Sequence, residues 1–137
     1  MTGPLRRRGD RGSMSISLAI VFPVVLLLLL LVVQAALIWY DRQVALTAAR
    51  EGVDAGRVQA KATEAEAEEA ARRQARDFLD RQGVHAYQVE TGDSTADTIK
   101  VSVELTPPLL IPGLTGPSVR QYAEAPRERF LPPAVTP

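Results

Sequence analysis

The residues best suited to acid–base or metal chemistry in this 137-residue chain are one histidine and a short acidic run. His85 is the only histidine, and the absence of cysteine excludes thiolate chemistry and cysteine-ligated zinc. The acidic run consists of Glu64, Glu66, Glu68 and Glu69. A carboxylate pair catalyses proton transfer where a pocket shifts one pKa, whereas the alanine and arginine neighbours here indicate a solvated helix face. We therefore predict that the protein is not an enzyme.

The chain also lacks the short motifs that accompany common cofactors and substrates. No Walker loop, GxGxxG, GxSxG or HExxH pattern occurs in it. His85 lies two residues after Gly83, between a predicted helix and a predicted strand, where we expect a partly exposed histidine without a special role. Outside the arginines near the N-terminus, no basic patch is interleaved with aromatic residues as nucleic-acid binding requires. We predict no cofactor, no metal and no nucleic-acid partner.

The element that must organise the chain is an uncharged stretch from Gly12 to Tyr40, whose centre is the run PVVLLLLLLVV beginning at Pro23. At ~1.5 Å per residue, a helix from Ile16 to Tyr40 is ~37 Å long and can cross a ~30 Å hydrocarbon layer. We predict a transmembrane helix over residues 13–40, with membrane lipid as its partner. Pro23 would remove one backbone hydrogen bond and permit a kink, which membrane helices tolerate.

The distribution of positive charge predicts the orientation of this helix. A basic leader over residues 1–12 precedes the span and contains Arg6, Arg7, Arg8 and Arg11. After the span come Asp41 and Arg42, and the next positive residue is Arg50. Because lysine and arginine flanking a span favour the cytoplasmic side, we predict a single-pass protein of the cytoplasmic membrane. Its N-terminus would be cytoplasmic and its C-terminal region extracytoplasmic.

The same stretch also has the layout of a secretory signal, with small residues around Ala35 where cleavage would occur. The apolar run from Leu18 to Val33 is longer than a typical signal core, and Trp39 and Tyr40 are placed like an interfacial aromatic belt. We favour a retained anchor over cleavage after Ala35.

Beyond the span, the composition predicts a helix over residues 41–82, rich in alanine, glutamate, arginine and glutamine, that ends at Gly83. Small and apolar residues recur along one face with a spacing of seven. Two interpretations remain open: an alanine-rich helix lying on its own small domain, or a seam that packs against partner helices. The residues predicted to take part in helix packing are Leu46, Ala49, Val53 and Gly56, together with Pro23 in the span.

After Gly83 the pattern changes to period two over residues 83–125. Ala86–Thr91 and Val119–Ala125 are candidate strands, and Thr98–Leu105 is a clear one, with Ile99, Val101, Val103 and Leu105 on a buried face and Lys100, Ser102 and Glu104 on a wet face. A Pro/Gly loop with Leu109–Ile111 is a candidate contact patch, and residues 126–137 form a Pro-rich tail. The predicted fold is an α+β membrane protein. One long N-terminal helix, the span continuing into the alanine-rich helix, precedes a small antiparallel sheet of two or three strands.

Three local features carry a resemblance to a known family. The basic leader ends at Gly12, a Phe22-Pro23 step opens the poly-leucine span, and Ala49-Arg50-Glu51-Gly52 follows it. Residues 11–57 thus resemble the N-terminal half of TadE-like proteins, pseudopilins of the bacterial tight-adherence (Tad/Flp) pilus system. The resemblance implies a structural or assembly role in a Tad-type pilus or related secretion apparatus, through helix packing and contacts with other pilin-like subunits. The alternative is a secreted or membrane-anchored extracytoplasmic binding module without a pilus role.

The resemblance also implies a processing site. In the family a prepilin peptidase cleaves after the glycine that ends the leader, which corresponds here to the bond between Gly12 and Ser13. A glutamate commonly stands five residues after that glycine, whereas this chain has Ser17, which offers a hydrogen bond but no charge. Gly12 either marks a cleavage site, with the peptidase as a partner, or simply ends the leader.

Overall fold

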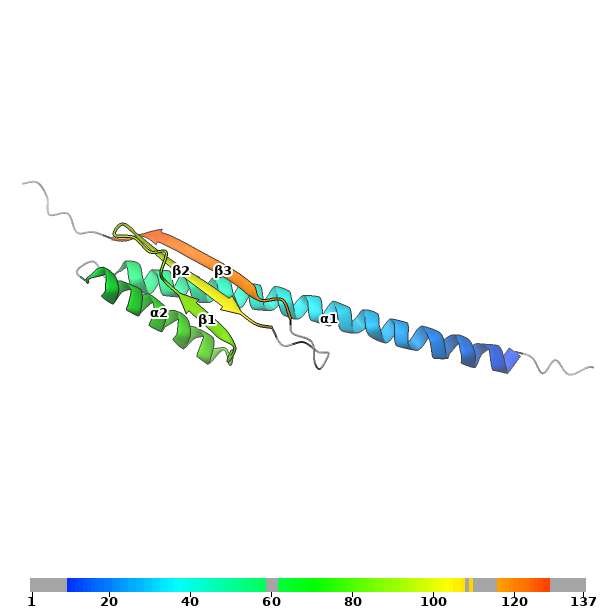
Figure 1. Ribbon diagram of the computed structural model, residues 1–137. Helices are drawn as coiled ribbons and strands as arrows, with labels where there is room; N and C mark the ends of the chain where they lie inside the picture. Colours follow the sequence, from blue (N-terminus) through cyan, green and yellow to red (C-terminus); the bar gives the residue numbers. More distant parts are fainter. Residues whose placement is uncertain (1–9, 59–61, 108, 110–115, 129–137) are drawn as a thin grey trace, which may run out of the picture. The chain divides into compact units, whose positions relative to one another are not determined.

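The structure, a computed structural model, describes residues 10–58, 62–107, 109 and 116–128 (Figure 1). Within these residues the chain divides into two compact units, Met1–Ala36, here the N-terminal unit, and Leu37–Pro137, here the folded unit. The two helices and three strands are α1 (Asp10–Arg57), α2 (Glu64–Arg81), β1 (Tyr87–Glu90), β2 (Thr98–Leu105) and β3 (Val119–Pro126).

From Leu18 to Val33, α1 is apolar on every side. The side chains from Ser17 to Val33, including Pro23, are all exposed. A helix without a polar face needs lipid or another protein around it. The helical segment Ser17–Arg57 contains a window that is long and apolar enough to cross a membrane, and none of that window is buried within the structure. The prediction of a long apolar N-terminal helix is confirmed.

The prediction of a single helix over residues 41–82 is wrong. α1 ends at Arg57 and α2 begins at Glu64. Thr63 caps α2: its hydroxyl oxygen accepts a hydrogen bond from the backbone N–H of Glu66 at 3.3 Å, and the Glu66 carboxylate accepts one from the backbone N–H of Thr63 at 2.8 Å. This reciprocal capping box starts a new helix inside a stretch of strong helix formers, and so allows the chain to fold back on α1.

The C-terminal end of α2 agrees with the sequence. Gly83 has a φ of 72°, the left-handed conformation that glycine adopts most easily. Its N–H donates to the carbonyl oxygen of Asp80 at 3.0 Å, and the N–H of Val84 donates to that of Leu79 at 3.0 Å. This pair of bonds is a Schellman motif, which satisfies the last carbonyl groups of the helix.

The three strands form one antiparallel sheet in the order β1-β2-β3. Val89 of β1 lies opposite Val103 of β2, and Val103 lies opposite Gln121 of β3. β2 has the predicted bounds, and β1 is shorter than the predicted strand. β3 extends one residue beyond its predicted end and so includes Pro126, the first residue of the predicted tail. The α+β class with a small antiparallel sheet is confirmed.

Two helices and one face of the sheet enclose the core. α2 presents a row of residues four apart, Ala67, Ala71, Ala75 and Leu79, and all four are buried. Most core side chains are small, so the elements approach closely rather than through large interdigitating side chains. The core cluster consists of Val44, Ala45, Ala48, Ala49, Val53, Ala71, Ala75, Leu79, Val89, Ile99, Val101, Val103 and Leu105.

The chain after β3 closes over the connection between the two helices. The Arg127 guanidinium donates to the carbonyl oxygen of Ala62 at 3.3 Å, and the N–H of Glu128 donates to that of Arg57 at 3.3 Å. The rest of the predicted tail, residues 129–137, lies outside the described residues, as do Leu110 and Ile111 of the predicted contact patch.

Candidate functional site

α1 packs closely on α2 and β2 at Gly52. A Cβ atom at this position would lie 2.8 Å from the carbonyl oxygen of Ala71, 3.2 Å from Cβ of Ala75 and 3.3 Å from Cγ1 of Val101. The first distance is too short for any side chain, and its partner is backbone that cannot rotate away. Only glycine fits at this crossing.

Gly56 repeats the arrangement one turn later. A Cβ atom there would lie 3.0 Å from Cγ1 of Ile99, 3.1 Å from the carbonyl oxygen of Ala67 and 3.1 Å from Cβ of Ala71. Residues four apart share one helix face, so the two glycines form a groove into which α2 fits. Each glycine costs a helix about 1 kcal/mol relative to alanine, and the close packing explains why both are present.

The Ala49-Arg50-Glu51-Gly52 motif divides between the core and the surface. Ala49 and Gly52 are buried, whereas Arg50 and Glu51 are exposed. The Glu51 carboxylate accepts a long hydrogen bond of 3.4 Å from the side-chain amide of Gln74 in α2. Gly52 of the motif therefore makes room for α2, and Glu51 contacts the same helix at the surface.

The other residues predicted to pack helices lie along the same seam. Val53 and Gly56 are buried and Leu46 is half-buried, all within the folded unit. Because Ala49 and Gly56 are buried within the folded unit, a partner helix could reach them only if elements of that unit separated, whereas Leu46 and Val53 border a groove beside β3. Pro23, in the N-terminal unit, is exposed inside α1.

A groove remains between α1 and the edge strand β3. It has a volume of about 420 Å³ and is bordered on the helix by Leu46, Arg50, Val53 and Asp54. On the strand it is bordered by Tyr122–Ala125, of which Tyr122 is 60% exposed. The partly uncovered apolar side chains and three exposed charged residues, Arg50, Asp54 and Glu124, make this groove a candidate surface for contact with another chain.

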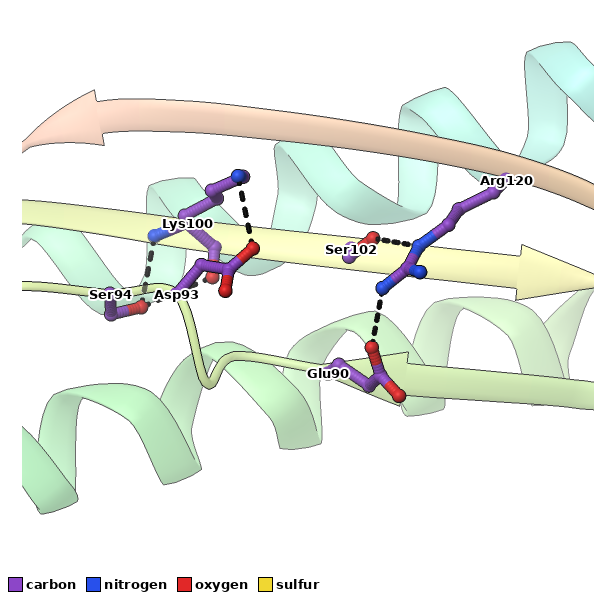
Figure 2. A network of polar contacts seen from close by, with 6 residues as sticks. All are labelled: Glu90, Asp93, Ser94, Lys100, Ser102 and Arg120. Carbon is purple, nitrogen blue, oxygen red and sulfur yellow. Dashed lines mark hydrogen bonds and ion pairs between the residues drawn. The ribbon is translucent and has the colours of Figure 1, made fainter.

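The outer face of the sheet carries a polar network (Figure 2). The Arg120 guanidinium of β3 crosses β2: its Nε donates to Oγ of Ser102 at 2.9 Å, and its Nη2 forms an ion pair with Glu90 of β1. Ser102, predicted on the wet face, is 9% exposed. Arg120 thus covers it and links the two edge strands across the central one.

A second part of the network holds the turn between β1 and β2. Nζ of Lys100 lies 3.1 Å from Oδ2 of Asp93 (Figure 2). The same Nζ lies 5.1 Å from the ring centroid of Tyr122. Oγ of Ser94 accepts from the backbone N–H of Lys100 at 3.0 Å and donates to its carbonyl oxygen at 3.1 Å. These contacts give the turn a defined conformation.

A hollow of about 300 Å³ lies beside this network, bordered also by Arg72 of α2. The Arg72 guanidinium donates to Oγ1 of Thr91 at 2.6 Å and to Glu69 at 2.7 Å, and the Thr91 hydroxyl, which is 1% exposed, donates to Glu68 at 3.2 Å. Each cation around the hollow is paired with a carboxylate. The arrangement pins α2 to the sheet and presents no activated nucleophile or acid–base pair.

The acidic run and the histidine have different surroundings. Glu66 belongs to the helix cap, Glu69 and Glu68 lie around Arg72 and Thr91, and His85 is exposed after α2. Among the residues that the structure describes, no three histidine, aspartate or glutamate side chains are grouped as metal ligands.

The candidate processing site lies at the start of α1. Gly12 and Ser13 are helical in backbone, because α1 begins at Asp10 within the predicted leader. Ser17, at the position of the family glutamate, is exposed on α1. Residues 1–9 of the leader lie outside the described residues.

The chain thus combines one apolar helix with a small α+β unit built on the continuation of that helix. Residues 12–54 match the family model described as TadE-like protein. The match begins at Gly12 and includes both the apolar run and the Ala49–Gly52 motif, so the resemblance is confirmed over this segment. No curated protein and no solved structure matches the chain.

Proposed function

We propose that this chain is a single-pass membrane subunit of a Tad-type pilus or related secretion apparatus, with a pseudopilin-like structural or assembly role. The observation that carries the proposal is the position of the family match over residues 12–54. It coincides with the exposed apolar part of α1 and ends beside Gly52 at the crossing with α2. A membrane anchor and a rigid small domain are what such a subunit requires.

The proposed orientation has the N-terminus in the cytoplasm and the folded unit outside. Arg6, Arg7, Arg8 and Arg11 precede the span, and this excess of positive charge favours the cytoplasmic side. The prepilin peptidase that processes pilin-like leaders on this side is a proposed partner, with Gly12–Ser13 as its bond. Ser17 would leave the new N-terminus without the charged partner that glutamate supplies.

Contacts with other pilin-like subunits would use surfaces that the chain's own fold leaves open. Because the small-residue seam is buried against α2, the proposed contacts are the span itself, within the membrane, and the groove between α1 and β3, outside it. The exposed backbone edge of β3 adds hydrogen-bonding groups to this groove. The proposed mechanism is therefore assembly through packing, without a chemical step.

Deletion of the gene in its own host tests the pilus role. We expect the loss of surface pili and of surface adherence, restored by the full-length chain supplied in trans. Unchanged piliation in the deletion strain would overturn the proposal.

N-terminal sequencing of the mature protein separates the accompanying alternatives. A start at Ser13 supports peptidase processing, and an intact N-terminus supports an unprocessed anchor. A start at Ala36 would instead support a secreted binding module and contradict a retained span.

A further inference from the structure

The folded unit begins within the apolar stretch rather than beyond it. This unit starts at Leu37, whereas the first charged residue after the span is Asp41. Leu37 and Ile38 are half-buried, while the aliphatic side chains from Leu18 to Val33 are exposed. The four residues from Leu37 to Tyr40 therefore belong both to the apolar stretch and to the folded unit.

The length of the uncharged stretch bears on where this overlap would lie. Gly12–Tyr40 is 29 residues, or ~43 Å of helix, which matches the thickness of a bilayer including its headgroup layers. The last four residues, Leu37–Tyr40, account for ~6 Å, about the depth of one headgroup layer. The uncharged stretch continues into the folded unit without a polar spacer.

The side chains at this position suit that environment. Trp39 is 64% exposed and Tyr40 is 53% exposed, and both residue types prefer the boundary between hydrocarbon and headgroups. Arg42 is exposed, with no hydrogen bond or ion pair to the rest of the described chain. An arginine one turn beyond a tryptophan is well placed to bind a lipid phosphate. Partial burial raises the pKa of Asp41, which makes its neutral form easier to reach beside an apolar layer.

The end of β2 lies about one helical turn beyond this overlap along α1. Gly56 packs against Ile99 and Gly52 against Val101, so β2 advances two residues for every four residues back along α1. Both steps are ~6 Å, and continuing them brings the end of β2, at Leu105, level with Val44. The chain after β2 leaves the sheet at this end of the folded unit (Figure 1).

That chain adds a further apolar side chain to this end. Pro107 is buried, and the half-buried Leu109 packs on Gly116, where a Cβ atom would lie 3.3 Å from Cγ of Leu109. The segment Leu37–Arg42 is called the collar.

We propose that the collar rests in the phospholipid headgroup layer, with Trp39 and Tyr40 at the hydrocarbon boundary and Arg42 on lipid phosphates. The collar thereby anchors the first residues of the folded unit in the headgroup layer. This inference rests on the membrane insertion in the proposed function, but on neither its orientation nor its pilus role.

Trp39 is the only tryptophan in the chain, so the quenching of its fluorescence by brominated lipids reports its depth in the bilayer. The full-length protein is reconstituted into bilayers of phosphatidylcholine and phosphatidylglycerol, with phosphatidylcholine brominated either near the ester end or near the methyl end of the chain. We expect quenching of Trp39 fluorescence to be about twofold stronger with bromine near the ester end.

Two other outcomes would overturn the proposal in distinguishable ways. Absent quenching, or stronger quenching from the methyl end, in protein that resists carbonate extraction would refute the collar and leave membrane insertion intact. Release of the protein by carbonate would refute insertion itself, and with it the proposed function.

Tryptophan placed elsewhere gives the matched controls, each in a Trp39→Phe background. Thr47→Trp puts the probe at an exposed position ~12 Å further along α1, where quenching by both lipids should be lost. Leu28→Trp puts it in the span, where bromine near the methyl end should quench more strongly. Equal quenching at positions 39 and 47 would contradict a collar at Trp39.

Arg42 is tested against Arg50, which is also exposed. With the wild-type chain, brominated phosphatidylglycerol should quench Trp39 more effectively than brominated phosphatidylcholine, up to about fivefold at low ionic strength. Arg42→Gln should remove this preference, and Arg50→Gln should leave it unchanged. An equal effect of the two variants would overturn the contact of Arg42 with lipid phosphate.

Discussion

Gly52 of α1 packs so closely on Ala71 of α2 that a Cβ atom at Gly52 would lie 2.8 Å from the Ala71 carbonyl oxygen. The contact joins two helices that helix propensity alone would have merged into one. It also gives the glycine of the Ala49–Gly52 motif a physical role, because the helix pair cannot close around any larger residue.

Gly52→Ala should destabilise the folded unit. Alanine raises helix propensity by about 1 kcal/mol, but the clash with backbone costs about 1–3 kcal/mol and also separates Val101 from α1, so the clash dominates. The midpoint of urea unfolding of the full chain in detergent, followed by near-UV circular dichroism, should fall. Gly92→Ala is the control, since nothing lies within 4 Å of its added methyl group. An unchanged midpoint for Gly52→Ala would contradict the close crossing.

Gly83→Ala should also destabilise, for a different reason. The space around Gly83 is open, but its φ of 72° disfavours a side chain by about 1 kcal/mol. Gly83→Asn should recover part of the loss in thermal stability, because asparagine tolerates this conformation. Equal losses for alanine and asparagine would show that backbone conformation is not the cause.

The elements that the sequence predicts well are those with a local signal. Strict alternation in Thr98–Leu105 marks the buried and outward faces of β2, and Gly83 after a run of helix formers marks the end of α2. In both cases the pattern lies within a few residues and no competing signal overlaps it.

The sequence contains a local signal for the break between α1 and α2, but the high helix propensity of the surrounding residues outweighs it. Thr63 and Glu66 have the spacing of a capping box, yet they lie among alanines and glutamates that favour an unbroken helix. The packing of α2 on α1 could be predicted only if Gly52 and Gly56 were interpreted as a contact surface for α2 rather than as residues that destabilise a single helix. The ion pair between Arg120 and Glu90 has no local signal, because thirty residues separate its partners.

Arg120 of the sheet network and Arg72 of α2 should differ in their contribution to stability. Arg120 forms an ion pair with Glu90 in which both side chains are more than half exposed. Its removal also uncovers the Ser102 hydroxyl, which can then bond to water, so Arg120→Ala should cost less than about 1 kcal/mol. Arg72 donates to the buried Thr91 hydroxyl, and Arg72→Ala should cost about 1–3 kcal/mol because that group loses a partner. Urea unfolding of both variants measures the difference. A larger loss of stability for Arg120→Ala than for Arg72→Ala would contradict this prediction.

Stability at acid pH should depend on the cap of α2. Hydrogen bonds from the backbone and side chain of Thr63 lower the pKa of Glu66 below its usual value. The unfolded chain therefore binds a proton at this residue more readily than the folded chain does, so the cap stabilises the fold above the unfolded pKa, and this contribution is lost as pH falls through the lowered pKa. In thermal unfolding from neutral to acid pH, Glu66→Gln should show a shallower decline of Tm than the wild-type chain. Glu64→Gln, in the same first turn, is the matched control. A decline as steep in Glu66→Gln as in the wild-type chain would show that the Thr63–Glu66 cap does not contribute to the acid sensitivity of the fold.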